Sequence, residues 1–281
     1  MRLKWIGAIA VALVCLGTAR ADVVERNTTQ KSFTYFGGSG RKLIVDDVHG
    51  SIDVVAYNGS EVQITVDERW KADDAGKMQE ARRDIKVDMS QQGNVVRLYV
   101  DGPFRCERGG CSSSRWRTGY NATFDFHIKV PADAALELKT VNGGHVRAEN
   151  SNGDFQVSNV NGGIELLEMA GSGSAHTVNG GVKVTFRENP RAPSSFKSVN
   201  GELAVSFRPD LGADFQCKTF NGGIYTDFEV SMTPMQTSSM ERHGTRNVYR
   251  VDRMSNIRIG PGGPAHTFDT LNGNIRILKR G

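Results

Sequence analysis

The sequence has few cysteines, few aromatic residues and little excess charge once its N-terminal segment is set aside. Of its 281 residues, 4 are cysteine and 8% are aromatic. So few cysteines exclude a small disulfide-rich scaffold. The formal charge of +4 comes mostly from Arg2, Lys4 and Arg20, without which 32 basic residues face 31 acidic ones. This balance leaves no polycation that would bind nucleic acid by counterion release.

Motifs of the common catalytic classes are missing too. The chain contains no G-x-S-x-G element, no H-E-x-x-H pair, no phosphate-binding loop and no dinucleotide fingerprint. Asp46, Asp47, His49 and Asp53 cluster near one turn. A cation site there competes with edge-strand charge that discourages aggregation, and we favour the second interpretation. We therefore expect no catalytic residues, no metal site and no cofactor.

Residues 1–21 have the organisation of an export signal. Two basic residues precede an apolar run, and an A-x-A site predicts cleavage after Ala21. The run is shorter than the roughly 20 residues that span a bilayer, so we expect no transmembrane segment after cleavage. The prediction is an exported protein of the periplasm or cell surface. Residues 22–32 are polar and are expected to form a flexible leader.

One dipeptide, Asn-Gly, recurs in the second half of the chain. The pairs are Asn142-Gly143, Asn152-Gly153, Asn161-Gly162, Asn179-Gly180, Asn200-Gly201, Asn221-Gly222 and Asn272-Gly273. Asn-Gly suits a turn that needs positive φ at both central residues. A small polar residue precedes each Asn by two positions, and alternating apolar residues follow, which is typical of a half-buried strand. The pattern predicts one short strand unit stacked many times.

The predicted fold is therefore all-β, a β-solenoid-like stack of short strands with Asn-Gly turns and one short helix near 73–83. The alternative is an antiparallel hairpin meander, because Asn-Gly is also the strongest short hairpin signal. We expect a single elongated domain over 33–281. It divides into N-terminal strands and helix at 33–130 with a loop insertion at 101–121, and a repeat array at 131–281 with an insertion at 231–253.

One repeat departs from the pattern. After Asn142 the inward positions would hold His145 and Arg147, whereas Val146 and Ala148 carry the apolar character. A bulge or one-residue slip at the start of the array explains this, because such a slip turns every following side chain to the other face.

Several segments, in this order, resemble a known family. They are GRKLIVDDVHGSIDV at 40–54, DAGKMQEARRDI at 74–85, the repeated VNGGI and VNGGV, and TLNGNIRIL at 270–278. Together with the export signal they resemble the putative adhesin family of bacterial envelope β-strand-repeat proteins, a domain of unknown function. The resemblance covers roughly 33–279 and implies a β-solenoid-like stack on an envelope protein without established catalytic residues.

The two insertions interrupt an otherwise regular array and are the predicted binding loops. In the first, the predicted contact residues are Arg105, Arg108, Arg115, Trp116, Arg117 and Tyr120. They would contact an unknown protein or glycan of the cell envelope. Cys106 and Cys111 lie in the same loop, and an oxidising compartment favours a disulfide between them.

The predicted function is that of an exported, non-catalytic, adhesin-like binding or scaffold module that presents loops on a β-repeat body. One alternative is a polysaccharide-active β-helix enzyme, for which Glu165 and Glu168 are the acids to test. Another is a component of envelope-stress signalling.

Overall fold

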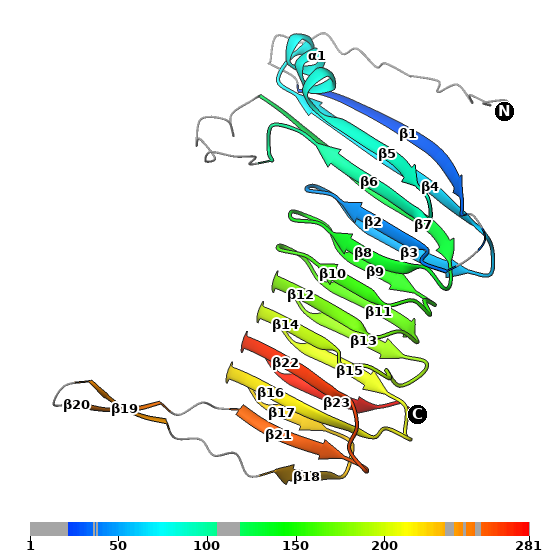
Figure 1. Cartoon of the computed structure of the whole chain (residues 1–281). Helices are drawn as coiled ribbons and strands as arrows, with labels where there is room; N and C mark the ends of the chain where they lie inside the picture. Colours follow the sequence, from blue (N-terminus) through cyan, green and yellow to red (C-terminus); the bar gives the residue numbers. More distant parts are fainter. Residues whose placement is uncertain are drawn as a thin grey trace.

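The computed structural model describes residues 22–35, 37, 39–105, 119–233, 239–243, 246–250 and 254–280. Between 232 and 254 it describes only the backbone. These residues form one helix and 23 strands, arranged as an elongated stack (Figure 1). The elements are β1 (Val23–Thr34), β2 (Lys42–Asp46), β3 (Ile52–Tyr57), β4 (Glu61–Ala72), α1 (Ala75–Asp84), β5 (Lys86–Gln92), β6 (Val95–Asp101), β7 (Tyr120–Pro131), β8 (Ala135–Lys139), β9 (Val146–Glu149), β10 (Phe155–Ser158), β11 (Ile164–Met169), β12 (Gly173–Asn179), β13 (Val182–Phe186), β14 (Ser195–Asn200), β15 (Leu203–Phe207), β16 (Ala213–Asn221), β17 (Ile224–Thr226), β18 (Val230–Thr233), β19 (Ser239–His243), β20 (Arg246–Arg250), β21 (Met254–Ile259), β22 (Ala265–Asn272) and β23 (Ile275–Lys279).

The strands belong to two large sheets. Sheet A has the order β1-β4-β7-β3-β9-β11-β13-β15-β23-β17, and sheet B has the order β18-β21-β16-β22-β14-β12-β10-β8-β2-β6-β5. From β8 to β17 the chain visits the sheets in turn, so each sheet B strand and the sheet A strand that follows it form one unit, called a rung below. The pairs β2–β3 and β22–β23 form rungs of the same kind. Neighbouring rungs pair in parallel in both sheets, as β10 does with β8 and β12, and β11 with β9 and β13.

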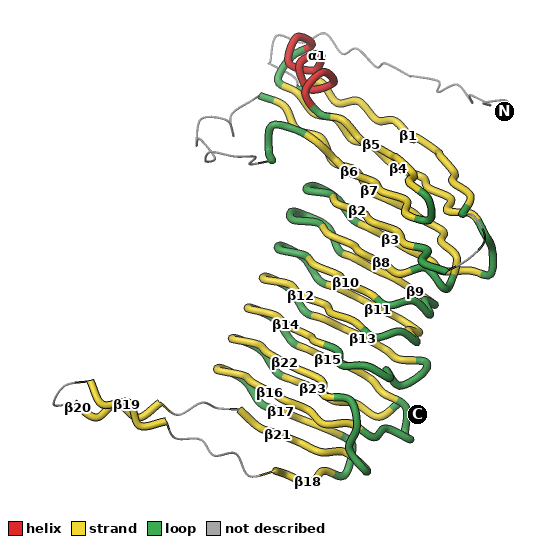
Figure 2. Tube along the Cα trace, in the orientation of Figure 1, coloured by secondary structure: helices red, strands yellow, loops and turns green. Residues whose placement is uncertain are grey.

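The all-β prediction with one short helix is confirmed. The antiparallel hairpin alternative does not describe the array, because the two strands that flank an Asn-Gly pair lie in different sheets and do not pair with each other (Figure 2). The helix expected near 73–83 is α1. Its N-cap Asp74 accepts a hydrogen bond from the backbone N–H of Lys77 at 2.8 Å, and Met78 and Ala81 are its buried residues.

Apolar side chains from the inner faces of the two sheets form the core. The strands alternate buried and exposed residues, as expected for a half-buried sheet. In the later rungs phenylalanine rings pack against each other from rung to rung. The ring centres of Phe186 and Phe207 are 5.2 Å apart, and those of Phe196 and Phe268 are 5.1 Å apart. Each such buried side chain contributes about 1.5–3 kcal/mol relative to exposure.

The Asn-Gly corners differ from the expected turn geometry. None of the asparagines of these pairs has positive φ, and Gly143, with φ of +80°, is the one glycine of the pairs whose backbone is clearly left-handed. The glycines are required for a different reason. A Cβ atom on Gly162 would lie 1.9 Å from the carbonyl oxygen of Gly144, and one on Gly201 would lie 1.9 Å from that of Gly180. Glycine therefore permits successive rungs to approach closely.

The irregular repeat after Asn142 contains one extra residue, as the apolar pattern indicates. Val146 and Ala148 are completely buried, and Val146 pairs with Ile164. Gly144, not Gly143, stands against the neighbouring carbonyl in the column of corner glycines. The extra residue therefore lies in the corner, and the strand after it keeps the common register.

The expectation of a flexible leader at 22–32 does not hold. Residues 23–34 form β1, which pairs antiparallel with β4 along its whole length. Without β1, the twelve-residue β4 would have a long edge of backbone groups without hydrogen-bond partners, and β1 supplies those partners. The sequence of β1 does not reveal this pairing, because β1 is mostly polar even where it lies opposite apolar residues of β4 such as Trp70, Val66 and Ile64.

The last rung in sequence is not the last in space. β22 lies between β14 and β16, and β23 lies between β15 and β17. β16 then pairs antiparallel with β21, and β21 with β18. Within 231–253 the described strands β19 and β20 pair with each other, away from the stack (Figure 1). No helix in the described part of the chain is long and apolar enough to span a membrane.

Candidate functional site

The described residues of the predicted 101–121 loop are held by the protein itself. The Arg105 guanidinium forms an ion pair with Asp46 at 3.0 Å and lies 4.1 Å from the centre of the Tyr99 ring. Tyr120 donates a hydrogen bond to Asp84 Oδ2 at 2.7 Å. Burial, with this bond, raises the pKa of Tyr120 to about 12. Both side chains thus anchor the ends of the loop.

The other predicted residues of this loop lie outside the described residues. They are Cys106, Arg108, Cys111, Arg115, Trp116 and Arg117. The disulfide and the binding role of the loop therefore remain predictions.

The acids considered for an enzyme are engaged in ion pairs. Glu165 contacts Lys183 and Arg147, each at 2.8 Å, and the hydrogen bond from Lys183 holds its pKa below the usual range. Glu168 pairs with Arg280 at 2.8 Å. A general acid in glycoside hydrolysis needs a raised pKa, so the environment of Glu165 opposes that role.

The four residues that cluster near one turn in the sequence are separated by the fold. Asp46 pairs with Arg105, Asp53 lies 3.0 Å from His145 Nε2, and Asp47 is completely buried. His49 stands at the end of the corner column, 3.5 Å from Asn142 Nδ2. In the part of the chain that the structure describes, no group of three His, Cys, Asp or Glu side chains is arranged to hold a metal ion.

The asparagines of the repeated corners form a hydrogen-bonded ladder. Nδ2 of each donates to Oδ1 of the neighbour, and the donor–acceptor distances are 2.7–2.9 Å. In spatial order its members are Asn142, Asn161, Asn179, Asn200, Asn272 and Asn221. Asn152 is not a member, because it lies at the opposite corner, between β9 and β10. The ladder holds rung against rung and leaves its exposed amides already paired.

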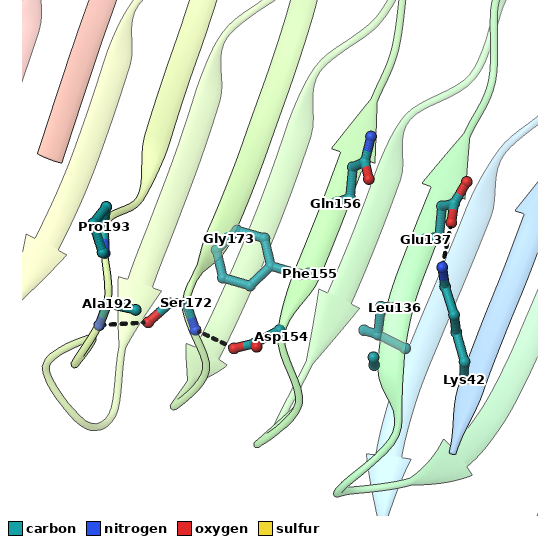
Figure 3. A pocket seen from close by; sticks show the side chains of 11 residues that line it. Lys42, Leu136, Glu137, Asp154, Phe155, Gln156, Ser172, Gly173, Ala192 and Pro193 are labelled. Carbon is teal, nitrogen blue, oxygen red and sulfur yellow. Dashed lines mark hydrogen bonds and ion pairs between the residues drawn. The ribbon is translucent and has the colours of Figure 1, made fainter. Parts of the chain in front are cut away.

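A shallow groove of about 360 Å³ crosses sheet B where its strands begin (Figure 3). Its lining comes from β2, β8, β10, β12 and the segment before β14. The lining residues are Lys42, Ala135, Leu136, Glu137, Asp154, Phe155, Gln156, Ser172, Gly173, Ala192 and Pro193. The groove therefore runs along the stack and meets a new rung at each step.

Hydrogen bonds between rungs hold the polar groups of the groove in place (Figure 3). Lys42 Nζ lies 2.6 Å from Glu137 Oε2. The Ser172 backbone N–H donates to Asp154 Oδ1 at 3.0 Å, and the Ala192 N–H donates to Ser172 Oγ at 3.1 Å. Three successive rungs are thus linked along one wall, so binding would require little reordering of this wall.

Gly173 stands at a point of close backbone contact beside the groove. It lies opposite Phe155 in the register, and a Cβ atom on it would lie 1.9 Å from the Phe155 carbonyl oxygen. Glycine therefore lets the backbones of β10 and β12 approach closely here. Sequence reasoning missed this site, because neither the Asn-Gly repeat nor a catalytic motif marks it. The usable signal was Gly173 at an apolar position of a strand, which indicates a close backbone approach.

No protein-family model and no curated protein matches the chain. Among solved structures, it is similar to a putative cell adhesion protein from Clostridium sporogenes ATCC 15579, with a TM-score of 0.42, 10% identity, and coverage of 90% of this chain and 100% of the other. It is also similar to a putative adhesin from Bacteroides fragilis NCTC 9343, with a TM-score of 0.35, 10% identity, and coverage of 90% and 97%. These likenesses identify no ligand for this chain.

Proposed function

We propose that the protein is an exported, non-catalytic binding module of the bacterial envelope, with a β-solenoid body. The observation that carries the proposal is the groove, a preorganised polar surface that crosses four strands of the stack and the segment before β14. The solenoid is supported by the parallel pairing of successive rungs and by the corner glycines that let them pack closely. Export with cleavage after Ala21 belongs to the same proposal.

The environment of the carboxyl groups supports binding over catalysis. Burial raises the pKa of Asp47 to about 7, the range that suits a general acid, but its side chain is completely buried. No substrate could reach it there. In the groove, Glu137 is paired with Lys42, and Asp154 already accepts a backbone N–H. These contacts position groups for recognition and do not prepare a proton donor.

The predicted loops would act as additional contact regions. The ends of the 101–121 segment adjoin β6 and β7, whereas β18 and β21 lie at the other end of the stack (Figure 1). A partner that touched both would have to extend along the body. A Cys106–Cys111 disulfide, if formed, would stiffen the first of these regions.

Retention on insoluble polysaccharide tests the proposal. The chain from residue 22 onward is incubated with cellulose, chitin and peptidoglycan, and both the bound fraction and the soluble reducing ends are measured. We expect retention on at least one polymer with no increase in reducing ends over time. A steady release of reducing ends would favour the polysaccharide-active enzyme, and failure to bind any of the polymers would contradict a glycan-binding module.

A further inference from the structure

We infer that the groove on sheet B binds a linear, uncharged polysaccharide chain that lies along the stack axis. The inference rests on the proposed function and deepens it, because it names the ligand class. It also places the site on the body of the protein, away from the two predicted loops.

The direction and length of the groove favour a chain-like ligand. It is lined by five neighbouring segments of sheet B, from Lys42 of β2 to Pro193 before β14. Strands in a sheet lie about 4.8 Å apart, so four such steps give a groove of about 19 Å. This step is close to the length of one pyranose unit in an extended glycan. A polymer with a short repeat can therefore present equivalent groups to successive strands.

The polar groups of the groove suit hydroxyl groups. Gln156 is exposed, and its amide offers both donors and an acceptor. Asp154 uses Oδ1 for the Ser172 N–H, which leaves Oδ2 as an acceptor. The Lys42 ammonium has three donors, and it is paired with Glu137 at 2.6 Å. Because a sugar hydroxyl both donates and accepts, it can pair with each of these groups.

The charges of the groove disfavour an anionic polymer. One lysine and two acids line it, and the lysine is already paired with Glu137. Asp154 then leaves the lining slightly negative, which repels phosphate or uronate groups at short range. Nucleic acids and acidic glycans are therefore poor ligands for this surface.

A peptide strand is disfavoured by the sheet itself. β8, β10 and β12 each have a hydrogen-bonded neighbour on both sides, so the groove offers no free strand edge. Peptide recognition by strand addition needs such an edge. What remains is recognition by side chains, with Ala192 and Pro193 as exposed apolar contacts for a sugar face. No aromatic ring is exposed among the lining residues, so we expect weak binding, with a Kd of about 0.1–1 mM.

In the first experiment the chain from residue 22 onward is titrated with oligosaccharides, and binding is measured by calorimetry and by changes in backbone amide chemical shifts. The ligands are cellohexaose and chitohexaose as neutral probes and hexagalacturonate as an anionic probe. We expect one neutral hexasaccharide to bind and to shift the amides of β8, β10 and β12. Hexagalacturonate is expected to bind at least tenfold more weakly.

Two variants locate the site, and a third is the matched control. Gln156→Ala removes the exposed amide and is expected to weaken binding about fivefold, as loss of about one hydrogen bond would. Ala192→Trp fills the groove from an exposed loop position and is expected to abolish binding. Gln216→Ala changes an exposed glutamine on the same face of sheet B, in β16, beyond the groove, and should leave the affinity unchanged.

Three results would overturn the inference. They are no binding of either neutral hexasaccharide at about 10 mM, a preference for hexagalacturonate, or unchanged affinity of both groove variants. Suppose that both groove variants still bind the glycan and that deletion of 106–118 abolishes binding. The ligand would then be held by the predicted loop, so this inference would fail while the proposed binding function would survive.

Discussion

In the regular rungs, from β8 to β15, the buried hydroxyl groups of Thr177 and Ser198 donate to the neighbouring rung, whereas at each of two irregular places a buried ionisable side chain has an atom without a partner among the described residues. Thr177 donates to the carbonyl of Gly162 and Ser198 to that of Gly180, both at 2.8 Å. Asp47, after the first rung strand β2, and His266, in the displaced strand β22, are both completely buried. Each has one side-chain atom, Oδ2 and Nε2 respectively, without a hydrogen-bond partner in the described structure.

The difference follows from repetition. One good pairing between a polar side chain and a glycine carbonyl is copied at each regular corner, so the cost of burying polar atoms is offset each time. Asp47 and His266 lie outside this column of corner residues, so neither has a copied partner, although Thr270 of β22 keeps the column's bond to the Gly201 carbonyl at 3.1 Å. A titratable group left there in the core makes stability depend on pH.

The largest effect is expected at a regular corner. Gly162→Ala would place a Cβ atom 1.9 Å from the Gly144 carbonyl oxygen, which requires the rungs to separate. We expect a loss of about 4 kcal/mol or more in the free energy of unfolding, measured by urea denaturation. Gly163→Ala is the control, because the nearest atom to its Cβ would be at an ordinary 3.5 Å. Equal losses in both variants would show that close rung contact is not what fixes glycine here.

This contrast also separates what the sequence could predict from what it could not. The Asn-Gly pairs and the alternation after them identify the strands of the rungs, since each corner repeats the same local pattern. Pairing between distant segments has no such local signal. Phe196 lies opposite Phe268, 72 residues later, and only the tertiary fold brings β22 there. The groove was missed for the same reason, because its lining comes from four strands and the segment before β14, which only the fold brings side by side.

At the first irregular place, we expect stability to fall as the pH rises. Burial raises the pKa of Asp47 to about 7 from its ordinary value of 3.8, so the folded state binds its proton more tightly than the unfolded state. The stabilisation is complete below about pH 3.8 and is lost as the pH rises to about 7, by up to about 4 kcal/mol. Asp47→Asn should abolish this dependence in urea titrations between pH 5 and pH 8.

The control for this prediction is Asp210→Asn, which alters an exposed carboxyl on the surface. It should leave the pH profile of the wild type unchanged. A wild-type profile that is flat over this range, or an Asp47→Asn profile with the same slope, would contradict the assignment.

At the displaced strand, the dependence has the opposite sign. His266 Nδ1 accepts the Ser194 N–H at 3.1 Å, and the rings of Phe207 and Phe215 lie 5.7 and 5.3 Å away. Burial lowers the pKa of His266 to about 4 from 6.5. Stability is therefore complete above about pH 6.5 and falls by up to about 3 kcal/mol as the pH drops to about 4.

His266→Gln tests this second sign. Glutamine can still accept the Ser194 N–H, so the variant should lose the acid dependence even though it loses some ring packing at neutral pH. Unfolding free energies at pH 7 and pH 4.5 measure both effects. His176→Gln, an exposed histidine on sheet B, should keep the wild-type difference, and a similar loss in both variants would point to a general acid effect.

The smallest effect compares two asparagines from the same dipeptide. Asn179 makes two ladder bonds, to Asn161 at 2.8 Å and from Asn200 at 2.9 Å, whereas Asn152 lies at the opposite corner outside the ladder. Asn179→Ala removes two hydrogen bonds between exposed amides and should lower the free energy of unfolding by about 1–2 kcal/mol. Asn152→Ala removes no ladder bond and should lower it by about 0.5 kcal/mol or less. Thermal unfolding of the two variants measures the difference. Equal losses would mean that the ladder adds nothing beyond turn preference, and that the corner glycines alone hold the rungs in register.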